Sequence, residues 1–330
     1  MTKHFYTLLS LAFLLLSADY AMAGNPDRQG EAGAAQLLMN PWARSSGVSA
    51  MTTASIRGVE ALRLNPAGIG RISKTEFVFG HTRYFEGTGI NLNAFGFASK
   101  IGKNGALGVS IMAVDFGDIA LTTDAQPEGT GATFSPSFSN LGIGYSHLFE
   151  NKISVGFTAR IVTEGTADVR AVAACFDAGV QYVTGPQDNF KFGISLRNVG
   201  SRMTYRGQGL AVTTTNPEDK GDYTLTYFQR SQSFELPSML NLGVSYDFVI
   251  NPKNKVMILG NFTANSFSQD QVGGGVEYSF NNVLAIRGGY KYEFGSDDPL
   301  TASVYTGLSG GISVEVHSKK EGNNQVGIDY

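Results

Sequence analysis

The residues that could carry out catalysis or bind a metal are few and scattered in this 330-residue chain. After the first 23 residues three histidines remain, His81, His147 and His317, and each stands alone in its segment. No His-Glu-x-x-His or phosphate-loop pattern is present. The single cysteine, Cys175, excludes an internal disulfide and a cysteine-rich metal site. The sequence therefore predicts no catalytic residue, no metal site and no cofactor.

Two pairs of acidic residues are the remaining candidates for a metal. Glu218-Asp219 and Asp297-Asp298 lie in loop-like segments, but neither has the regular spacing of oxygen ligands in a calcium loop. We interpret them as solvated acids in turns. A hydrolase that brings Ser and His together from different strands stays open as an alternative.

Composition narrows the class of protein. The net charge of -3 and the pI near 5.8 argue against a nucleic-acid partner, which usually requires a basic face. Charged residues make up 16% of the chain, below the ~25% typical of soluble domains, and aromatic residues make up 11%. This balance favours a protein in contact with lipid.

Strict alternation of apolar and polar residues runs through most of the chain and predicts β-strands. In residues 240–248 one face carries Leu240, Leu242, Val244, Tyr246 and Phe248, and the other carries small or polar residues. Most of the segments with this pattern are long enough to cross a membrane as tilted strands of ~9 to 11 residues. The thirteen segments are 75–85, 89–99, 106–116, 137–148, 153–163, 172–183, 189–199, 238–249, 255–265, 271–280, 283–292, 303–316 and 323–330.

Charged residues in these strands occupy the face opposite the apolar residues. A charge at the middle of a bilayer would cost ~2 to 4 kcal/mol, so this sorting is expected if the apolar face contacts lipid. In residues 89–99, Phe95 and Phe97 instead share a face with Asn91 and Asn93, which predicts lumenal apolar aromatics there. The sorted charges are Arg160, Asp177, Lys191, Arg197, Asp247, Glu277, Arg287, Lys291, Glu315 and Asp329.

The links between the strands alternate in length. Short links include residues 150–152, 250–254 and 281–282, and the links between them include longer ones at 117–136, 164–171, 200–237 and 293–302. Short turns at one end and long loops at the other are typical of outer-membrane barrels. The fold class expected is therefore all-β, a transmembrane antiparallel up-and-down β-barrel. Because such a barrel closes with an even number of strands, we expect that a final strand is missing, with pairing by the N-terminal segment as the alternative.

Three domains follow from this layout. Residues 1–23 have a basic start, an apolar run and Ala21-Met22-Ala23, which predicts a signal peptide. Residues 24–74 are not strand-like and are expected to form a partly helical plug, or hatch, with a short helix at 30–39. It ends in the turn motif Asn65, Pro66, Ala67 and Gly68. Residues 75–330 form the barrel.

The link at 200–237 has many aromatic residues for an outward loop. One interpretation is that some of these aromatic residues form a girdle at the membrane interface. The more specific hypothesis is that they form a partner-binding surface. These residues are Tyr205, Tyr223, Tyr227, Phe228 and Phe234.

At residues 64–68 (Leu-Asn-Pro-Ala-Gly) the chain resembles the FadL-type outer-membrane barrels. Residues 30–34, 40–44, 55–61, 91–96 and 176–182 look like the PorV/PorQ family of the type IX secretion system. That resemblance implies a fourteen-stranded, FadL-like barrel without enzymatic activity, in the outer membrane of a Gram-negative, Bacteroidota-like bacterium. It also implies partners: the type IX translocon and the C-terminal signal domains of secreted cargo.

The sequence leaves two candidate functions, which belong to different functional classes of outer-membrane protein. The first is a PorV/PorQ-like secretion component that binds cargo and translocon through its outward loops. The alternative is a FadL-like channel for a hydrophobic small molecule, for which Phe95 and Phe97 are the one hint of an apolar lumen. Both place the chain in contact with outer-membrane lipid.

Overall fold

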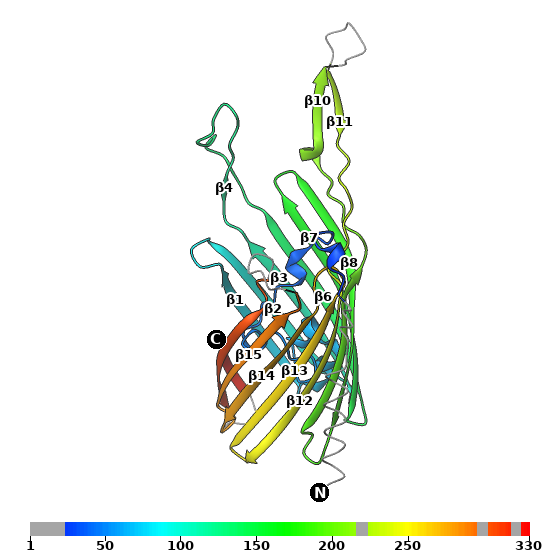
Figure 1. Ribbon diagram of the computed structural model, residues 1–330, viewed down its shortest axis with the longest axis vertical. Coiled ribbons are helices and arrows are strands. Elements are labelled where there is room, and N and C mark those ends of the chain that lie inside the picture. Colours follow the sequence, from blue (N-terminus) through cyan, green and yellow to red (C-terminus); the bar gives the residue numbers. More distant parts are fainter. Residues whose placement is uncertain (1–23, 216–223, 296–302, 318–324) are drawn as a thin grey trace.

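Thirteen antiparallel strands form one sheet that curls into a barrel (Figure 1). The computed structural model describes residues 24–215, 224–295, 303–317 and 325–330. All thirteen predicted strands are confirmed, and their order in the sheet follows the chain. The strands are β1 (Thr75–Tyr84), β2 (Ile90–Ile101), β3 (Gly105–Asp115), β6 (Ser137–Phe149), β7 (Ile153–Thr166), β8 (Val169–Thr184), β9 (Phe190–Gly200), β12 (Met239–Asn251), β13 (Asn254–Asn265), β14 (Gln271–Phe280), β15 (Leu284–Glu293), β16 (Gly307–His317) and β17 (Gln325–Asp329).

The two edge strands of the sheet are β1 and β17, and no pairing between them occurs among the described residues. The fourteenth strand implied by the resemblance has no counterpart in this part of the chain. The N-terminal segment does not supply one there either, since its described residues form no strand of the sheet and make one isolated β-bridge, between Ala32 and Glu235.

The N-terminal segment lies inside the barrel as a chain of short helical turns. These are η1 (Pro26–Arg28), η2 (Ala35–Leu37), α2 (Ala43–Ser46), α3 (Ala61–Leu64) and η3 (Pro66–Arg71). The helix predicted at 30–39 is wrong, because only the three residues of η2 are helical. Gly30 and Ala34 both have positive φ angles, which interrupt a helix at this point.

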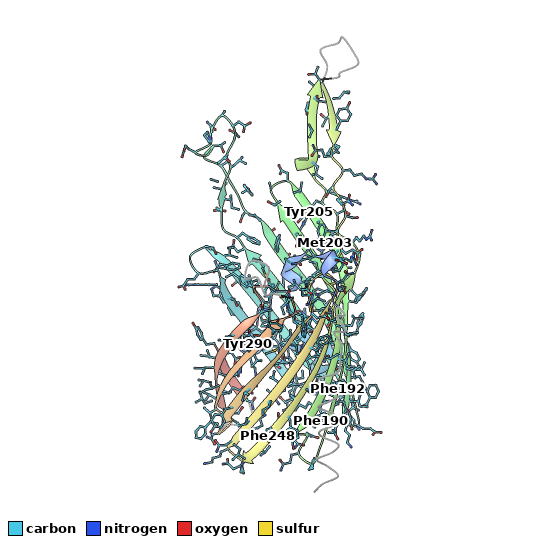
Figure 2. All side chains as sticks on the ribbon, viewed as in Figure 1. Phe190, Phe192, Met203, Tyr205, Phe248 and Tyr290 are labelled. Atoms are coloured by element: carbon cyan, nitrogen blue, oxygen red, sulfur yellow. The ribbon has the colours of Figure 1, made fainter. Side chains whose placement is uncertain are left out.

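The outer face of the sheet is apolar and the inner face carries the charges. Ile161 and Val244 are 53% and 46% exposed on the outer face, whereas Arg160 and Asp177 are buried on the inner face. Phe190, Phe192 and Phe248 lie near the short-turn end of the barrel (Figure 2). Among the described residues, no helix is long and apolar enough to span a membrane.

The prediction that Phe95 and Phe97 face the lumen is wrong. On β2 it is Leu92, Ala94 and Ala98 that are buried inside the barrel, so the two phenylalanines point outward, with Phe95 47% exposed. The reason is that the hatch covers this part of the wall with apolar side chains, including Trp42. The face of β2 that carries Asn91 and Asn93 together with the two phenylalanines is therefore the outer one.

The connections are sorted by length to the two ends of the barrel. Those at the short-turn end include residues 102–104, 150–152 and 281–283. The long-loop end carries two projecting hairpins, β4 (Ile119–Ala120) with β5 (Thr133–Phe134), and β10 (Ala211–Thr215) with β11 (Thr224–Phe228) (Figure 1). The short helical turn η4 (Gln208–Leu210) directly precedes β10 in the chain.

One predicted long loop is not a loop. Residues 164–171 are almost entirely strand, because β7 and β8 continue past the apolar belt and join through the two residues 167–168. The polar residues in this stretch therefore belong to an extension of the sheet beyond the belt.

The hatch forms the core of the barrel interior. Its Trp42, Val59 and Leu62 pack with Leu92 and Met112 of the wall, and a second cluster joins Leu37 to Met203 and Leu236. Gly24 lies at the long-loop end, since a Cβ atom placed on it would be 2.8 Å from the Asp270 backbone nitrogen. From there the segment crosses the lumen to Thr75 at the opposite end.

Candidate functional site

The hatch turn at residues 65–68 lies buried in the lumen, where Asn65 begins η3. The Asn65 side chain accepts the N–H of Ala67 at 3.2 Å, which is the usual cap of a helical turn. Its amide nitrogen donates to the carbonyl oxygen of Thr53 at 2.8 Å and to that of Val180 on β8 at 3.3 Å. The motif therefore fixes the turn and attaches it to the wall.

Strands β6 to β9 hold the hatch through hydrogen bonds to its backbone carbonyl oxygens, and we call this the hydrogen-bonded side. Wall side chains donate to hatch carbonyl oxygens: Ser146 to Ala67 at 2.9 Å, Arg160 to Leu62 at 3.0 Å, Gln181 to Ile56 at 2.9 Å, and Ser195 to Leu64 at 2.8 Å. Three glycines of the wall also allow the hatch backbone to approach the strands closely. A Cβ atom at any of them would overlap hatch atoms: Gly156 with Pro66, Gly179 with Asn65, and Gly193 with Thr53.

A group of arginines is buried on this side. Arg160 Nη2 lies 2.8 Å from Asp177 Oδ2, and both side chains are at most 1% exposed. Arg63 of the hatch donates to the carbonyl oxygens of Met39 and Gln36, each at 2.6 Å. Burial, Arg160 and other nearby arginines lower the pKa of Arg63, which indicates that its charge is costly here. Contacts with carbonyl oxygens and one carboxylate offset part of that cost.

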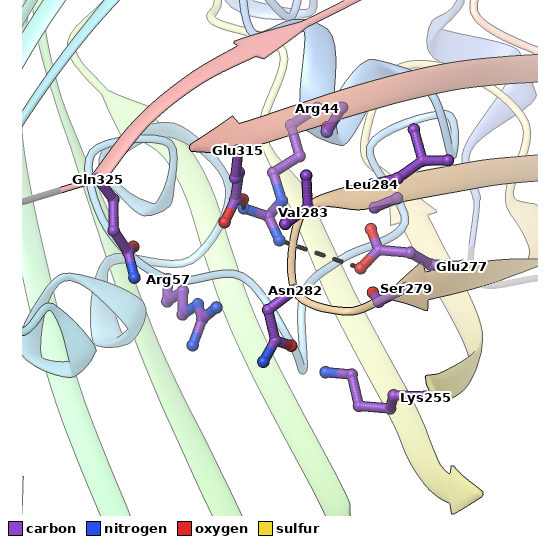
Figure 3. Close-up of a pocket in the computed structure, with 12 residues that line it drawn as sticks. Arg44, Arg57, Lys255, Glu277, Ser279, Asn282, Val283, Leu284, Glu315 and Gln325 are labelled. Carbon is purple, nitrogen blue, oxygen red and sulfur yellow. Dashed lines mark hydrogen bonds and ion pairs between the residues drawn. The ribbon is translucent and has the colours of Figure 1, made fainter. Parts of the chain in front are cut away.

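Strands β14 to β17 hold the hatch through ion pairs, and we call this the charged side. Arg44 of the hatch lies 3.1 Å from Glu315 and 4.0 Å from Glu277 (Figure 3). Arg287 pairs with the same Glu277 at 2.9 Å. Ser49 Oγ of the hatch and Ser309 Oγ of β16 are 2.8 Å apart.

The buried carboxyl group of Glu60 lies in the hatch near the charged side. It accepts the backbone N–H of Ser45 at 3.2 Å. Burial raises its pKa to about 7, and the hydrogen bond from Ser45 and the charge of Arg44 oppose this rise. Glu60 is thus a hatch acid whose protonation changes in the neutral range.

A cavity of about 190 Å³ opens beside the Arg44 ion pairs. Its lining comes from the hatch, the β12–β13 and β14–β15 hairpins, β16 and β17 (Figure 3). The residues with polar side chains include Arg57, Lys255 and Asn282. Because Asn282 belongs to a short turn, the cavity lies at the short-turn end of the barrel.

The four described aromatic residues among those predicted in the 200–237 link do not form one surface. Tyr205 donates to Glu164 at 2.9 Å and its ring lies 5.8 Å from that of Phe234, so both belong to the packing beneath the loop. Tyr227 and Phe228 lie on β11, away from the barrel, and are 51% and 62% exposed. Tyr223 lies outside the described residues.

Catalytic groups are not brought together in the described part of the chain. Residues 307–311 spell Gly-Leu-Ser-Gly-Gly, but Ser309 lies within β16 and bonds to Ser49 rather than to a histidine. No cluster of three or more His, Cys, Asp or Glu with metal-binding geometry occurs among the described residues. The acidic pairs 218–219 and 297–298 lie outside them.

Sequence reasoning found Asn65 but missed most of the wall residues that hold the hatch. Ser146, Gln181 and Ser195 are ordinary polar residues on the lumenal faces of strands, and only their alternation with lipid-facing residues marks them. Arg44 lies in a hatch segment that resembles the PorV/PorQ family, but its ion pairs with Glu277 and Glu315 span more than 200 residues of sequence.

Known proteins were compared with the chain at three levels. No family model and no curated protein matches it. Among solved structures, the CymD monoaromatic hydrocarbon channel is 15% identical, with a TM-score of 0.51, covering 84% of this chain and 89% of CymD. The toluene transporter TodX of Pseudomonas putida is 13% identical, with a TM-score of 0.50, covering 86% of this chain and 90% of TodX.

At such low identity these similarities establish only the fold, which is a FadL-like barrel. Both structural neighbours are transport channels by name and neither is named as an enzyme.

Proposed function

We propose that this protein is an outer-membrane barrel of a Gram-negative bacterium that lets hydrophobic small molecules cross the membrane. The observation that carries the proposal is the apolar lumenal wall along β2 and β3, formed by Leu92, Ala94 and Met112. The lumen of a water-filled porin is polar instead. The fold shared with two hydrocarbon channels supports the same class of cargo.

The hatch has to move before a molecule can pass, because Trp42, Val59 and Leu62 cover the apolar wall. Displacement of these side chains would leave an apolar passage next to β2 and β3. The charged side borders a cavity, so we place the movement there.

A reversible cross-link tests the proposal. Ser49→Cys with Ser309→Cys, in a Cys175→Ala background, puts two thiols where the hydroxyl oxygens are 2.8 Å apart. In cells, uptake of radiolabelled toluene should fall under oxidising conditions to the level of cells lacking the protein, and reducing agent should restore it. Ser49→Cys alone is the control. Equal toluene uptake with and without the protein would refute the channel function.

A second candidate is a PorV/PorQ-like component of the type IX secretion system. The observation that favours it is the projecting β10–β11 hairpin, which exposes Tyr227 and Phe228. A two-stranded hairpin of this kind is marginally stable alone in water, so a protein partner would stabilise it. Co-purification of a translocon or of cargo signal domains, lost in Tyr227→Ser with Phe228→Ser, would support this function. Secretion that continues normally without the protein would oppose it.

A further inference from the structure

The cavity on the charged side is lined by more positive than negative side chains. Arg57 of the hatch is exposed and makes no hydrogen bond or ion pair with any described residue. Lys255 lies 3.4 Å from Asp247, which is already engaged by Lys191 at 2.7 Å. One carboxylate is therefore shared by two lysines, and Arg57 forms no ion pair, since its attraction to the Glu76 carboxylate acts only at longer range.

The acidic groups of the cavity are already paired. Glu277 accepts Arg287 at 2.9 Å and Glu315 accepts Arg44 at 3.1 Å. Arg57 and Lys255 lie on the two sides of Asn282, whose side-chain amide adds a neutral donor between them (Figure 3). The lining of the cavity therefore has a net positive charge, and Arg57 and Lys255 are its positive groups nearest to Asn282.

We infer that this cavity binds a small anion, bearing a carboxylate or a phosphate, that enters from the short-turn end. Guanidinium and ammonium groups form their strongest hydrogen bonds with such oxyanions. The cavity of about 190 Å³ is much larger than a single water molecule requires, so it admits a carboxylate or phosphate with a short stem. The inference does not require the lumen to conduct.

Charge-selective thiol labelling tests the site. Ser279→Cys introduces a thiol in the cavity lining, and the native Cys175 is fully buried. The purified barrel is treated with a negatively charged and a positively charged methanethiosulfonate of similar size. The control is Gln187→Cys in the exposed turn between β8 and β9.

At each position we compare the labelling rate of the negative reagent with that of the positive reagent. We expect this ratio to be about tenfold higher at position 279 than at position 187, equivalent to ~1.4 kcal/mol. Arg57→Gln with Lys255→Gln should remove most of that preference, and Arg57→Lys with Lys255→Arg should keep it. Inorganic phosphate should slow labelling at 279 and leave labelling at 187 unchanged. Each barrel is first checked for folding by its heat-modifiable migration on gels.

The source of the anion is separated by repeating the labelling in nanodiscs. Protection in phosphatidylglycerol nanodiscs without added phosphate identifies a lipid head group, whereas protection only with added phosphate or acetate identifies a free anion. The inference is wrong if both positions show the same reagent preference. It is also wrong if the glutamine variants leave the preference unchanged, or if phosphate and phosphatidylglycerol both fail to protect position 279.

Discussion

The two sides of the hatch are attached to the wall by different physical means. On the hydrogen-bonded side, neutral donors meet hatch carbonyls and wall glycines allow close backbone contact, with Arg160 and Asp177 fully enclosed. On the charged side, Arg44 is about one-third exposed and its ion pairs border a cavity. Water screens exposed pairs and does not reach enclosed ones. We therefore expect the hydrogen-bonded side to anchor the hatch and the charged side to release first.

The largest effect is expected from removing the enclosed arginine. Arg160→Met leaves the Asp177 carboxylate buried without its cation. Breaking a buried ion pair in this way lowers the free energy of unfolding by about 3 to 5 kcal/mol. Denaturant unfolding of the barrel in detergent should measure this loss. Arg160→Met with Asp177→Asn should recover part of it, and a single variant as stable as the wild type would contradict the anchoring role.

A smaller effect is expected from Glu60, through pH. Its carboxyl group has a pKa near 4.5 when the chain is unfolded and about 7 in the folded hatch, so the folded state holds the proton more tightly. The hatch is therefore most stable below pH 4.5 and loses up to ~3 kcal/mol as the pH rises through 7.

Glu60→Gln should abolish this pH dependence while keeping an acceptor for the Ser45 N–H. Hydrogen exchange of the hatch amides measures this pH dependence. Comparing the variant with the wild type at the same pH cancels the intrinsic dependence of exchange rates on pH. The two proteins should match at pH 4, and the variant should be better protected at pH 8. A constant difference across the range would contradict the raised pKa.

The smallest effect on stability is expected from Arg44→Gln. Partly exposed ion pairs contribute about 0 to 1 kcal/mol, and salt weakens them. Hydrogen exchange should increase slightly for α2 and not for η3, and 1 M salt should produce the same change in the wild type. A loss as large as that of Arg160→Met would show that the two sides are equivalent.

The barrel could be predicted because lipid contact imposes a pattern on single strands. Residues 240–248 show their lipid-facing and lumenal faces without any reference to other parts of the chain. The hatch could not be predicted in the same way, since contacts such as Gln181 to Ile56 join residues 125 positions apart. Phe95 and Phe97 were assigned to the wrong face for the same reason, because the apolar hatch surface opposite β2 comes from a distant segment. The Asn65 turn was recognisable because its cap is local.

The position of Gly24 constrains how the molecule is assembled. The described chain begins beside Asp270 at the long-loop end and reaches Thr75 only after crossing the whole lumen. If the sheet curled first, about fifty residues would have to be threaded through a narrow interior. Curling of the strands around an already placed N-terminal segment avoids that step, so we expect the hatch to act as an internal template on which the wall is built.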